Sequence, residues 1–290
     1  MPSTPKEADH GQDTRRRRRH RFRQHDHARL PGRGSPGRHR ARQDRRGGHH
    51  EEFNKLSKGI AKRRINPFDK VKPMGLDYDR VSASLVEYDA SEWNSLWEAT
   101  EVDFEEKGEL AQAIRYAMER RKDQIVLDAA DALSTALTVS INQGGTNTSL
   151  NMPKLRRGNA LLDDKGVPST ERIAVHHVFA KEGMLGETQV TSADFNSVRA
   201  LVNGEINSLL GLDFKWLNSR DEGGLPLTGG HSRQGFIWHR KAIGLAVAKD
   251  SEVEVNYIPE NKAWLNSKGY KAGAIGIDAN GVVETATYEG

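Results

Sequence analysis

DFEEKGELAQAIRYAMERRKDQIVLDAADA, residues 103–132, is a long helical pattern near the middle of the chain. Leu110, Ile114, either Ala117 or Met118, Ile125 and Ala129 recur at helical spacing and form one apolar stripe. Acidic residues crowd the first turn, where they favourably oppose the helix dipole. Some 25 residues at 1.5 Å each make a helix of about 37 Å, which is long enough to cross a whole domain. The pattern predicts one continuous helix from about residue 104 to residue 132.

The segment before this helix alternates between apolar and polar residues. Val81, Ala83 and Leu85 share one side of an extended chain, which predicts a strand at about 80–88, on one side of a long hairpin. Trp93 and Trp97 follow at helical spacing. Two tryptophans four residues apart are typical of core packing, and they are also suited to anchoring a contact between subunits.

The segment after the helix mixes helices and strands. NMPKLRRGNALLDDKGVP predicts a helix that begins at Asn151 or Pro153 and stops at Gly166. ERIAVHHVF, residues 171–179, predicts a buried strand. TSADFNSVRALVNG, residues 191–204, predicts a helix with a capping box and a C-terminal glycine, and 212–217 alternates as a strand.

The last third of the chain predicts strands separated by glycine-rich loops. FIWHRKAIGLAVAKD predicts a short strand and a helix, and SEVEVNYI a strand. YKAGAIGIDANGVVETATYE predicts two strands paired about a DANG turn, because Asn280-Gly281 favours the positive φ angles of tight hairpins. The regular βαβ alternation of nucleotide-binding enzymes is missing, so the predicted fold class is α+β.

Charge is distributed unevenly along the chain. Residues 11–50 contain 14 Arg and three Asp, a net charge of +11, whereas residues 51–290 carry −6 of the overall +4. The basic stretch has only four apolar residues, too few to offset the entropy of ordering, so it is expected to be disordered.

The Arg-rich stretch has three interpretations. As an arm that neutralises phosphates, it would contact nucleic acid through the arginines at its start. It would otherwise be an inert solvated tail, or the product of a GC-rich reading frame translated in the wrong register or from too early a start. The candidate nucleic-acid contacts are Arg15, Arg16, Arg17, Arg18, Arg19, Arg21 and Arg23.

Residues suited to chemistry are sparse. Cysteine is absent, which excludes disulfides, thiolate metal sites and a cysteine nucleophile. His176, His177, His231 and His239 have no metal-ligand spacing, and adjacent histidines in a strand point to opposite faces. No apolar run approaches the length of a membrane span. We therefore predict no catalytic residue, no cofactor, no metal ligand and no membrane contact, and an enzyme is not expected.

Several ordered blocks together resemble the major capsid proteins of tailed bacteriophages. These are RRKDQI in the long helix, GVPSTERIAV, TSADFNSVRALVNGEINSLLG, FIWHRKAIGLAV and the closing GAIGIDANGVVET, within a match from about Val71 to Gly290. The resemblance implies the Hong Kong 97-like shell fold, which encapsulins share. It implies a subunit that assembles with itself into hexamers and pentamers around double-stranded DNA. It also implies phage portal and scaffolding proteins as partners, and a location in the virion capsid after assembly in the host cytoplasm.

Mapped on this chain, the resemblance implies five parts. They are a disordered basic arm at 1–79, an extended loop at 80–105, a spine helix at 106–131, an axial domain at 132–245 and closing strands of a peripheral domain at 246–290. Trp93 and Trp97 are the candidate subunit contacts. The alternatives are a nucleic-acid-binding protein that acts through the Arg-rich arm, and a cellular encapsulin-type shell protein.

Overall fold

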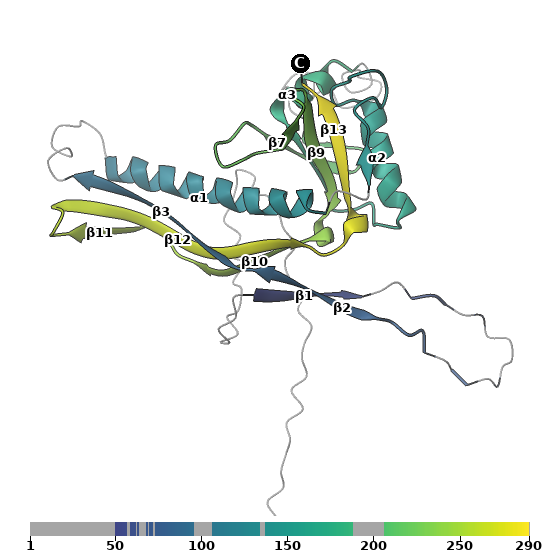
Figure 1. The fold of residues 1–290 in the computed structure, drawn as a ribbon, viewed down its shortest axis with the longest axis horizontal. Coiled ribbons are helices and arrows are strands. Elements are labelled where there is room, and N and C mark those ends of the chain that lie inside the picture. The colour runs from purple at the N-terminus through teal and green to yellow at the C-terminus, as the bar shows by residue number, and fades with distance from the viewer. Residues whose placement is uncertain are drawn as a thin grey trace, which may run out of the picture.

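The computed structural model describes residues 50–56, 59–61, 63, 68, 70–71, 73–95, 106–133, 137–187 and 206–289 (Figure 1). The Arg-rich stretch with its seven candidate arginines, the predicted helix at 191–204 and Trp97 lie outside these residues. The fold is α+β, as predicted, with the long helix lying between two separate sheets (Figure 1).

The long helix is α1, Glu106–Asp131, and its prediction is confirmed. Its 26 residues correspond to a length of about 39 Å at 1.5 Å per residue. Ile114, Met118, Ile125 and Ala129 of the predicted stripe are buried. Met118 and Ile125 pack on one sheet, while Val126 and its neighbours in the last two turns pack on the other. The helix therefore joins the two sheets through two different faces.

A four-stranded sheet lies along one side of α1 in the described part of the chain. Its long central strand is β12, Ala263–Gly276. β10 (Ile243–Asp250) and β11 (Glu254–Ile258) pair with successive halves of one edge of β12, and β3 (Val86–Ser95) pairs antiparallel with the other edge. In Figure 1 this sheet is the elongated ribbon below the helix.

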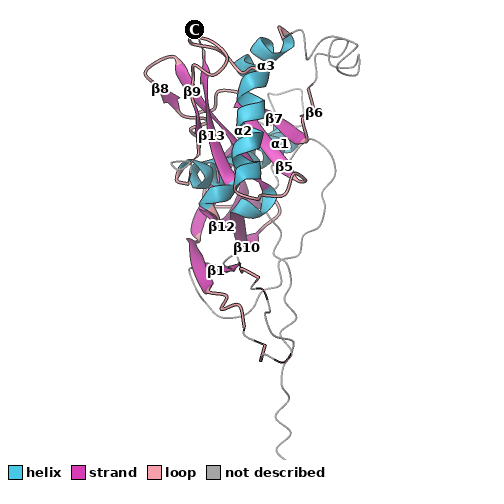
Figure 2. Ribbon diagram, turned by 90° about the vertical axis from the view of Figure 1, so that its right-hand side faces the viewer, coloured by secondary structure: helices cyan, strands magenta, loops and turns pink. Residues whose placement is uncertain are grey.

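A seven-stranded sheet forms the second layer, within the described residues. Its order is β4-β13-β9-β5-β7-β6, with β8 paired to β9, and β5 and β7 are parallel. Helix α2 (Met152–Asp164) packs against this sheet, and α3 (Val178–Leu185) follows β5 (Figure 2). The strands are β4 Thr138–Val139, β5 Arg172–His177, β6 Ser208–Leu209, β7 Leu212–Leu217, β8 Leu227–Thr228, β9 Ser232–His239 and β13 Val282–Tyr288.

Four predictions about local elements of the two sheets and of α2 are confirmed. Every residue of β5 is buried, as expected of a fully buried strand. The side chain of Asn151 caps α2 by accepting a hydrogen bond from the backbone N–H of Lys154. The alternation at 212–217 forms β7, and residues 254–258 of SEVEVNYI form β11.

The predicted closing hairpin is wrong. β12 and β13 flank the DANG turn, but β12 pairs with β10 while β13 pairs with β9, so the two strands belong to different sheets. The turn is a single 3-10 turn, η4 (Ala279–Gly281), in which Asp278 Oδ1 accepts from Asn280 N. The predicted helix after FIWH is also wrong, because the 3-10 turn η3 (Arg240–Ala242) leads directly into β10.

The predicted strand at about 80–88 is two strands that diverge. β2, Tyr78–Ser84, pairs antiparallel with β1, His50–Leu56, and after Leu85 the chain continues as β3 into the four-stranded sheet. Trp93 therefore lies in a strand and not in a helix. The two paired strands lie at 50–56 and 78–84, and the bounds that the resemblance implies, an arm at 1–79 and an extended loop at 80–105, stay predictions.

Candidate assembly surfaces

The hairpin of β1, β2 and the connecting residues 57–77, here called the arm, is fixed to the body through one aromatic ring. Phe53 is 4% exposed and packs with Ala83, Leu85 and Ala246. A Cβ built on Gly244 of β10 would lie 2.7 Å from this ring, so the ring occupies the space of the missing side chain. A surface ion pair between Lys55 and Asp278, at 3.2 Å, adds a second tie.

A second close approach lies where β2 passes into β3. A Cβ on Gly273 of β12 would be 2.0 Å from the carbonyl oxygen of Ser84. Because that oxygen belongs to the backbone, no side-chain rotation can relieve the contact. The crossing of the arm over β12 therefore depends on glycine at position 273.

Beyond its base, the arm exposes apolar side chains. Ile60 is 76% exposed, Val71 87% and Tyr78 76%, and Leu56 and Met74 are about half exposed. A two-stranded hairpin alone is marginally stable in water, and apolar residues gathered on a protruding segment typically mark a surface that another chain covers. The arm is thus the principal candidate for contact with a partner.

The basic triplet of α1 ties the helix to its surroundings. Arg120 Nε donates to Glu222 at 2.8 Å, and Lys122 Nζ donates to Asp250 at 2.6 Å. Arg121 lies over the ring of Tyr88, 5.9 Å from its centroid. These side chains point toward different elements, so they bridge parts of the body instead of forming a single solvated face.

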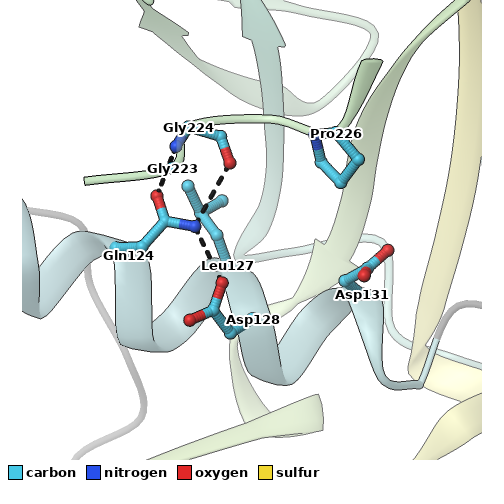
Figure 3. Close-up of a pocket in the computed structure, with 7 residues that line it drawn as sticks. All are labelled: Gln124, Leu127, Asp128, Asp131, Gly223, Gly224 and Pro226. Carbon is cyan, nitrogen blue, oxygen red and sulfur yellow. Dashed lines mark hydrogen bonds between the residues drawn. The ribbon is translucent and has the colours of Figure 1, made fainter. Parts of the chain in front are cut away.

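A latch of two hydrogen bonds joins α1 to the loop between β7 and β8, and a third hydrogen bond, within α1, orients the Gln124 amide (Figure 3). The Gln124 amide nitrogen donates to Gly224 O at 3.2 Å and to Asp128 at 2.7 Å, and its oxygen accepts from Gly224 N at 2.8 Å. Gly223 and Gly224 adopt positive φ angles of 133° and 72°, which lets the loop present its backbone to the helix. The adjoining pocket is about 220 Å³.

A buried ion pair reinforces the latch. Arg220 donates to Asp123 Oδ2 at 3.2 Å, and both side chains are only about a tenth exposed. Burial raises the pKa of Asp123 to about 6, and the positive charge of Arg220 offsets that effect only in part. The negative charge of Glu119 raises the pKa further.

The raised pKa of Asp123 predicts a pH dependence of stability. Between pH 4 and pH 6 the folded chain binds a proton that the unfolded chain has released, so the free energy of unfolding falls as pH rises through 6. The loss amounts to at most about 3 kcal/mol, since each pKa unit corresponds to about 1.4 kcal/mol. Melting temperatures at pH 5 and pH 7.5 should therefore differ less in Asp123→Asn than in the native chain. Asp213→Asn, at an exposed position of β7, is the control and should keep the native difference.

One cluster of polar side chains, around His177, resembles a catalytic arrangement, but its contacts connect the ends of strands. His177 lies 2.9 Å from Glu289 and 3.3 Å from Ser219 Oγ, and Arg233 pairs with Glu289 at 3.0 Å. Burial lowers the pKa of His177. These contacts connect the ends of β5, β9 and β13. His176 is fully enclosed, and burial lowers its pKa to about 3. Within the described ranges, no group of three or more His, Asp or Glu side chains is arranged to hold a metal ion.

The described residues thus combine a two-sheet body, a long helix between the sheets and a protruding arm, with the most exposed apolar residues on the arm. A family model described as phage capsid protein matches residues 22–289. The chain belongs to the phage capsid protein family. It is a capsid protein located in the virion capsid, and it assembles with itself into a shell.

Solved phage structures share the fold of this capsid protein. The Mycobacterium phage Che8 chain is 16% identical, with a TM-score of 0.59, over 82% of this chain and 84% of that one. The chain in the capsid structure of cyanophage P-SCSP1u is 12% identical, with a TM-score of 0.63, over 84% of this chain and 84% of that one. The chain in the head structure of Helicobacter pylori bacteriophage KHP40 is 9% identical, with a TM-score of 0.64, over 82% of this chain and 85% of that one. The Hong Kong 97-like fold is confirmed. A search of curated proteins found no significant match.

Of the predicted contact residues, the structure places Trp93. It lies near the end of β3 with 46% of its surface exposed, while Trp97 and the seven arginines of the basic stretch are outside the described residues. The main anchors of the capsid protein, Phe53 and the Gln124 latch, were not predicted. The positive-φ pair Gly223-Gly224 was the available signal for the latch, but a glycine-rich loop does not reveal its partner.

Proposed function

We propose that the protein is the major capsid subunit of a tailed phage, which forms the hexamers and pentamers of an icosahedral shell around double-stranded DNA. The observation that carries this proposal is the arm, which is fixed at its base by Phe53 and exposes apolar side chains along its length. Exposed apolar side chains on a protruding element typically mark an interaction surface, and a neighbouring subunit is the partner that a shell supplies. Burial of many such contacts stabilises a closed symmetric assembly without a catalytic site.

The proposed role is structural and not enzymatic. In the described residues, His177 and Asp123 form ion pairs with Glu289 and Arg220 that link elements of the body, and His176 is fully enclosed. The helices of the described part contain no segment long and apolar enough to cross a membrane.

Portal and scaffolding proteins are the further partners proposed, with assembly in the host cytoplasm.

The proposed division of the chain follows the two sheets. Most of the seven-stranded sheet, with α2 and α3, corresponds to the axial domain, 132–245, and α1 with the four-stranded sheet corresponds to the peripheral domain, 106–131 and 246–290. The exception is β13, which belongs to the seven-stranded sheet although it lies within 246–290. We place the extended loop at His50–Ser84, because these strands pair only with each other among the described residues. The Arg-rich N-terminal stretch then ends before residue 50.

Particle formation tests the proposed function. The full chain, expressed alone and with scaffolding and portal proteins of its phage, should sediment as large particles and appear in negative-stain images as closed shells tens of nanometres across. A chain that remains monomeric under both conditions would contradict the proposal.

The Arg-rich stretch supports contact with the packaged DNA. Its net charge of +11 suits neutralisation of phosphates through Arg15, Arg16, Arg17, Arg18, Arg19, Arg21 and Arg23. Removing residues 1–49 should therefore lower the affinity for duplex DNA and flatten its salt dependence while shells still form. If shell formation is lost and DNA affinity is unchanged, the stretch has an assembly role and this assignment is wrong.

A further inference from the structure

The two sheets of the body are joined by two short crossings of the chain that lie side by side. The first is η3, Arg240–Ala242, between β9 and β10, and the second is the segment 277–281, between β12 and β13, which contains η4. The carbonyl oxygen of Ala242 accepts hydrogen bonds from Ile277 N at 2.7 Å and from Asp278 N at 3.2 Å. The first crossing therefore holds the second in place.

Strand register fixes where the second crossing begins and ends. Gly276, the last residue of β12, is opposite Ile243 of β10. Val282, the first residue of β13, is opposite Trp238 of β9. Trp238, Ile243 and Val282 are fully buried. The five residues 277–281 therefore span a fixed gap, and neither strand can slide to take up extra chain without moving large buried side chains.

The second crossing carries Asn280-Gly281, one of two Asn-Gly pairs in the sequence. Asn280 is exposed, and within the described residues its side chain makes no hydrogen bond. Asparagine is a thermolabile residue, and a following glycine has no side chain to hinder its own nitrogen from approaching the asparagine side chain. In deamidation, the backbone nitrogen of Gly281 bonds to Cγ of Asn280, and the bond from Cγ to Nδ2 breaks with release of ammonia. The resulting succinimide takes up one water molecule and opens to aspartate or to isoaspartate.

The folded crossing withholds the nitrogen that this reaction needs. Gly281 N donates to the carbonyl oxygen of Asp278 at 3.0 Å, and Asn280 N donates to Asp278 Oδ1 at 3.3 Å. Gly281 is buried, and a Cβ built on it would lie 2.7 Å from Cβ of Ala242. Attack on Asn280 therefore requires η4 to open and to separate from the first crossing.

We propose that Asn280 is a deamidation site that reacts only when η4 opens, and that isoaspartate at this position prevents the crossing from closing again. Isoaspartate adds one methylene group to the main chain, because the backbone then runs through the side chain. The longer backbone must fit a gap of fixed length beside Ala242, where the packing has no space for even a methyl group.

The aspartate product is expected to behave differently. It leaves the backbone unchanged and adds one negative charge at an exposed position, two residues from Asp278. The nearby ion pair between Asp278 and Lys55, at 3.2 Å, lies on the surface, where such interactions are weak. One reaction thus gives a product that folds and a product that does not. Both effects belong to the single chain and do not require the proposed shell.

Peptide mapping by mass spectrometry tests the protection. The full chain is incubated in mildly alkaline buffer with and without a denaturing concentration of urea. Conversion at Asn280 should be about tenfold or more slower without urea, since the reaction then waits for local opening. Asn203-Gly204, the other Asn-Gly pair, should convert in urea and so reports that the chemistry proceeds. Equal conversion of Asn280 under both conditions, or none in urea, would overturn the proposal.

Asn280→Gln is the matched control for this measurement. Its side chain is one methylene longer, so attack by Gly281 N would close a six-membered ring in place of the five-membered succinimide, which is much slower. The variant should show no conversion at position 280 in urea. Because the position is exposed, it should also melt at the native temperature. Conversion equal to that of the native chain would show that the signal does not arise from Asn280.

Refolding separates the two products. Chains aged in urea are diluted into buffer, and size-exclusion chromatography separates the folded fraction from the rest. An isoaspartate-specific methyltransferase distinguishes the two products, which have equal mass. The ratio of isoaspartate to aspartate at position 280 should be about tenfold lower in the folded fraction, and Asn280→Asp should fold like the native chain. Equal ratios in both fractions would show that the crossing accepts the longer backbone, and the proposal would be wrong.

Discussion

Replacing Gly273 with alanine is expected to abolish shell formation and to lower the free energy of unfolding by about 3 kcal/mol, the upper range for overpacking. The new Cβ would lie 2.0 Å from the carbonyl oxygen of Ser84, so the backbone of either β12 or the β2–β3 crossing must move. Either movement displaces the base of the arm. Chemical denaturation measures the stability, and electron microscopy measures the shells.

Gly269→Ala is the matched control for this prediction. Gly269 lies in the same strand, but a Cβ there would be 3.7 Å from the carbonyl oxygen of Tyr88, an ordinary contact. The control should be neutral or slightly stabilising, because alanine loses less backbone freedom on folding than glycine. Equal stability and equal shell yield in both variants would show that the Gly273 contact does not position the arm.

Phe53→Ala is expected to detach the arm while leaving the rest of the subunit folded. Truncating a buried phenylalanine costs about 3–5 kcal/mol, and here the loss falls on the contacts that join β1 and β2 to β10. Amide hydrogen exchange in residues 50–56 and 78–84 should become much faster, whereas exchange in α1 and β12 should not change. Shell yield should fall at least tenfold.

The conservative variant Phe53→Leu keeps most of the buried volume and should cost less than about 1.5 kcal/mol. It should retain shells. If Phe53→Ala assembles as well as Phe53→Leu, the arm does not need a fixed base and the account of this surface is wrong. Uniformly faster exchange throughout the Phe53→Ala subunit would instead show that Phe53 belongs to the main core.

Local patterns in the sequence were sufficient to predict the elements whose stabilising contacts are close in sequence or fully apolar. The apolar stripe predicted where α1 lies in the sequence, because residues that recur every 3.6 positions indicate the buried face of a helix. The Asn151 cap of α2 depends on a hydrogen bond to a residue three positions on. β5 was recognisable because both of its faces are buried.

Elements defined by distant partners were not predictable. The buried face of β1 carries a single large apolar residue, Phe53. The sequence of β1 therefore shows no alternation of apolar and polar residues, and its partner in β10 cannot be recognised from it. The strands around the DANG turn were predicted to pair with each other, but the choice between a hairpin and two sheets depends on β9 and β10 competing as partners. Short-range turn chemistry does not record that competition.

The surfaces were the least predictable feature. Trp93 was nominated as a subunit contact from its spacing to Trp97, but the face it shares with Asp89 and Glu254 follows from strand register. The Gln124 latch joins residues about 100 positions apart, and one glutamine in a polar helix face carries no sign of it. The uneven distribution of charge, by contrast, could be counted directly from the sequence.

Hydrogen exchange across residues 50–84, compared between intact shells and dissociated subunits, tests most directly the claim that this protein acts by covering its arm with a neighbouring subunit. We expect exchange in this segment to slow at least tenfold on assembly, more than in the already buried strand β5. Equal exchange in intact shells and free subunits would contradict the claim.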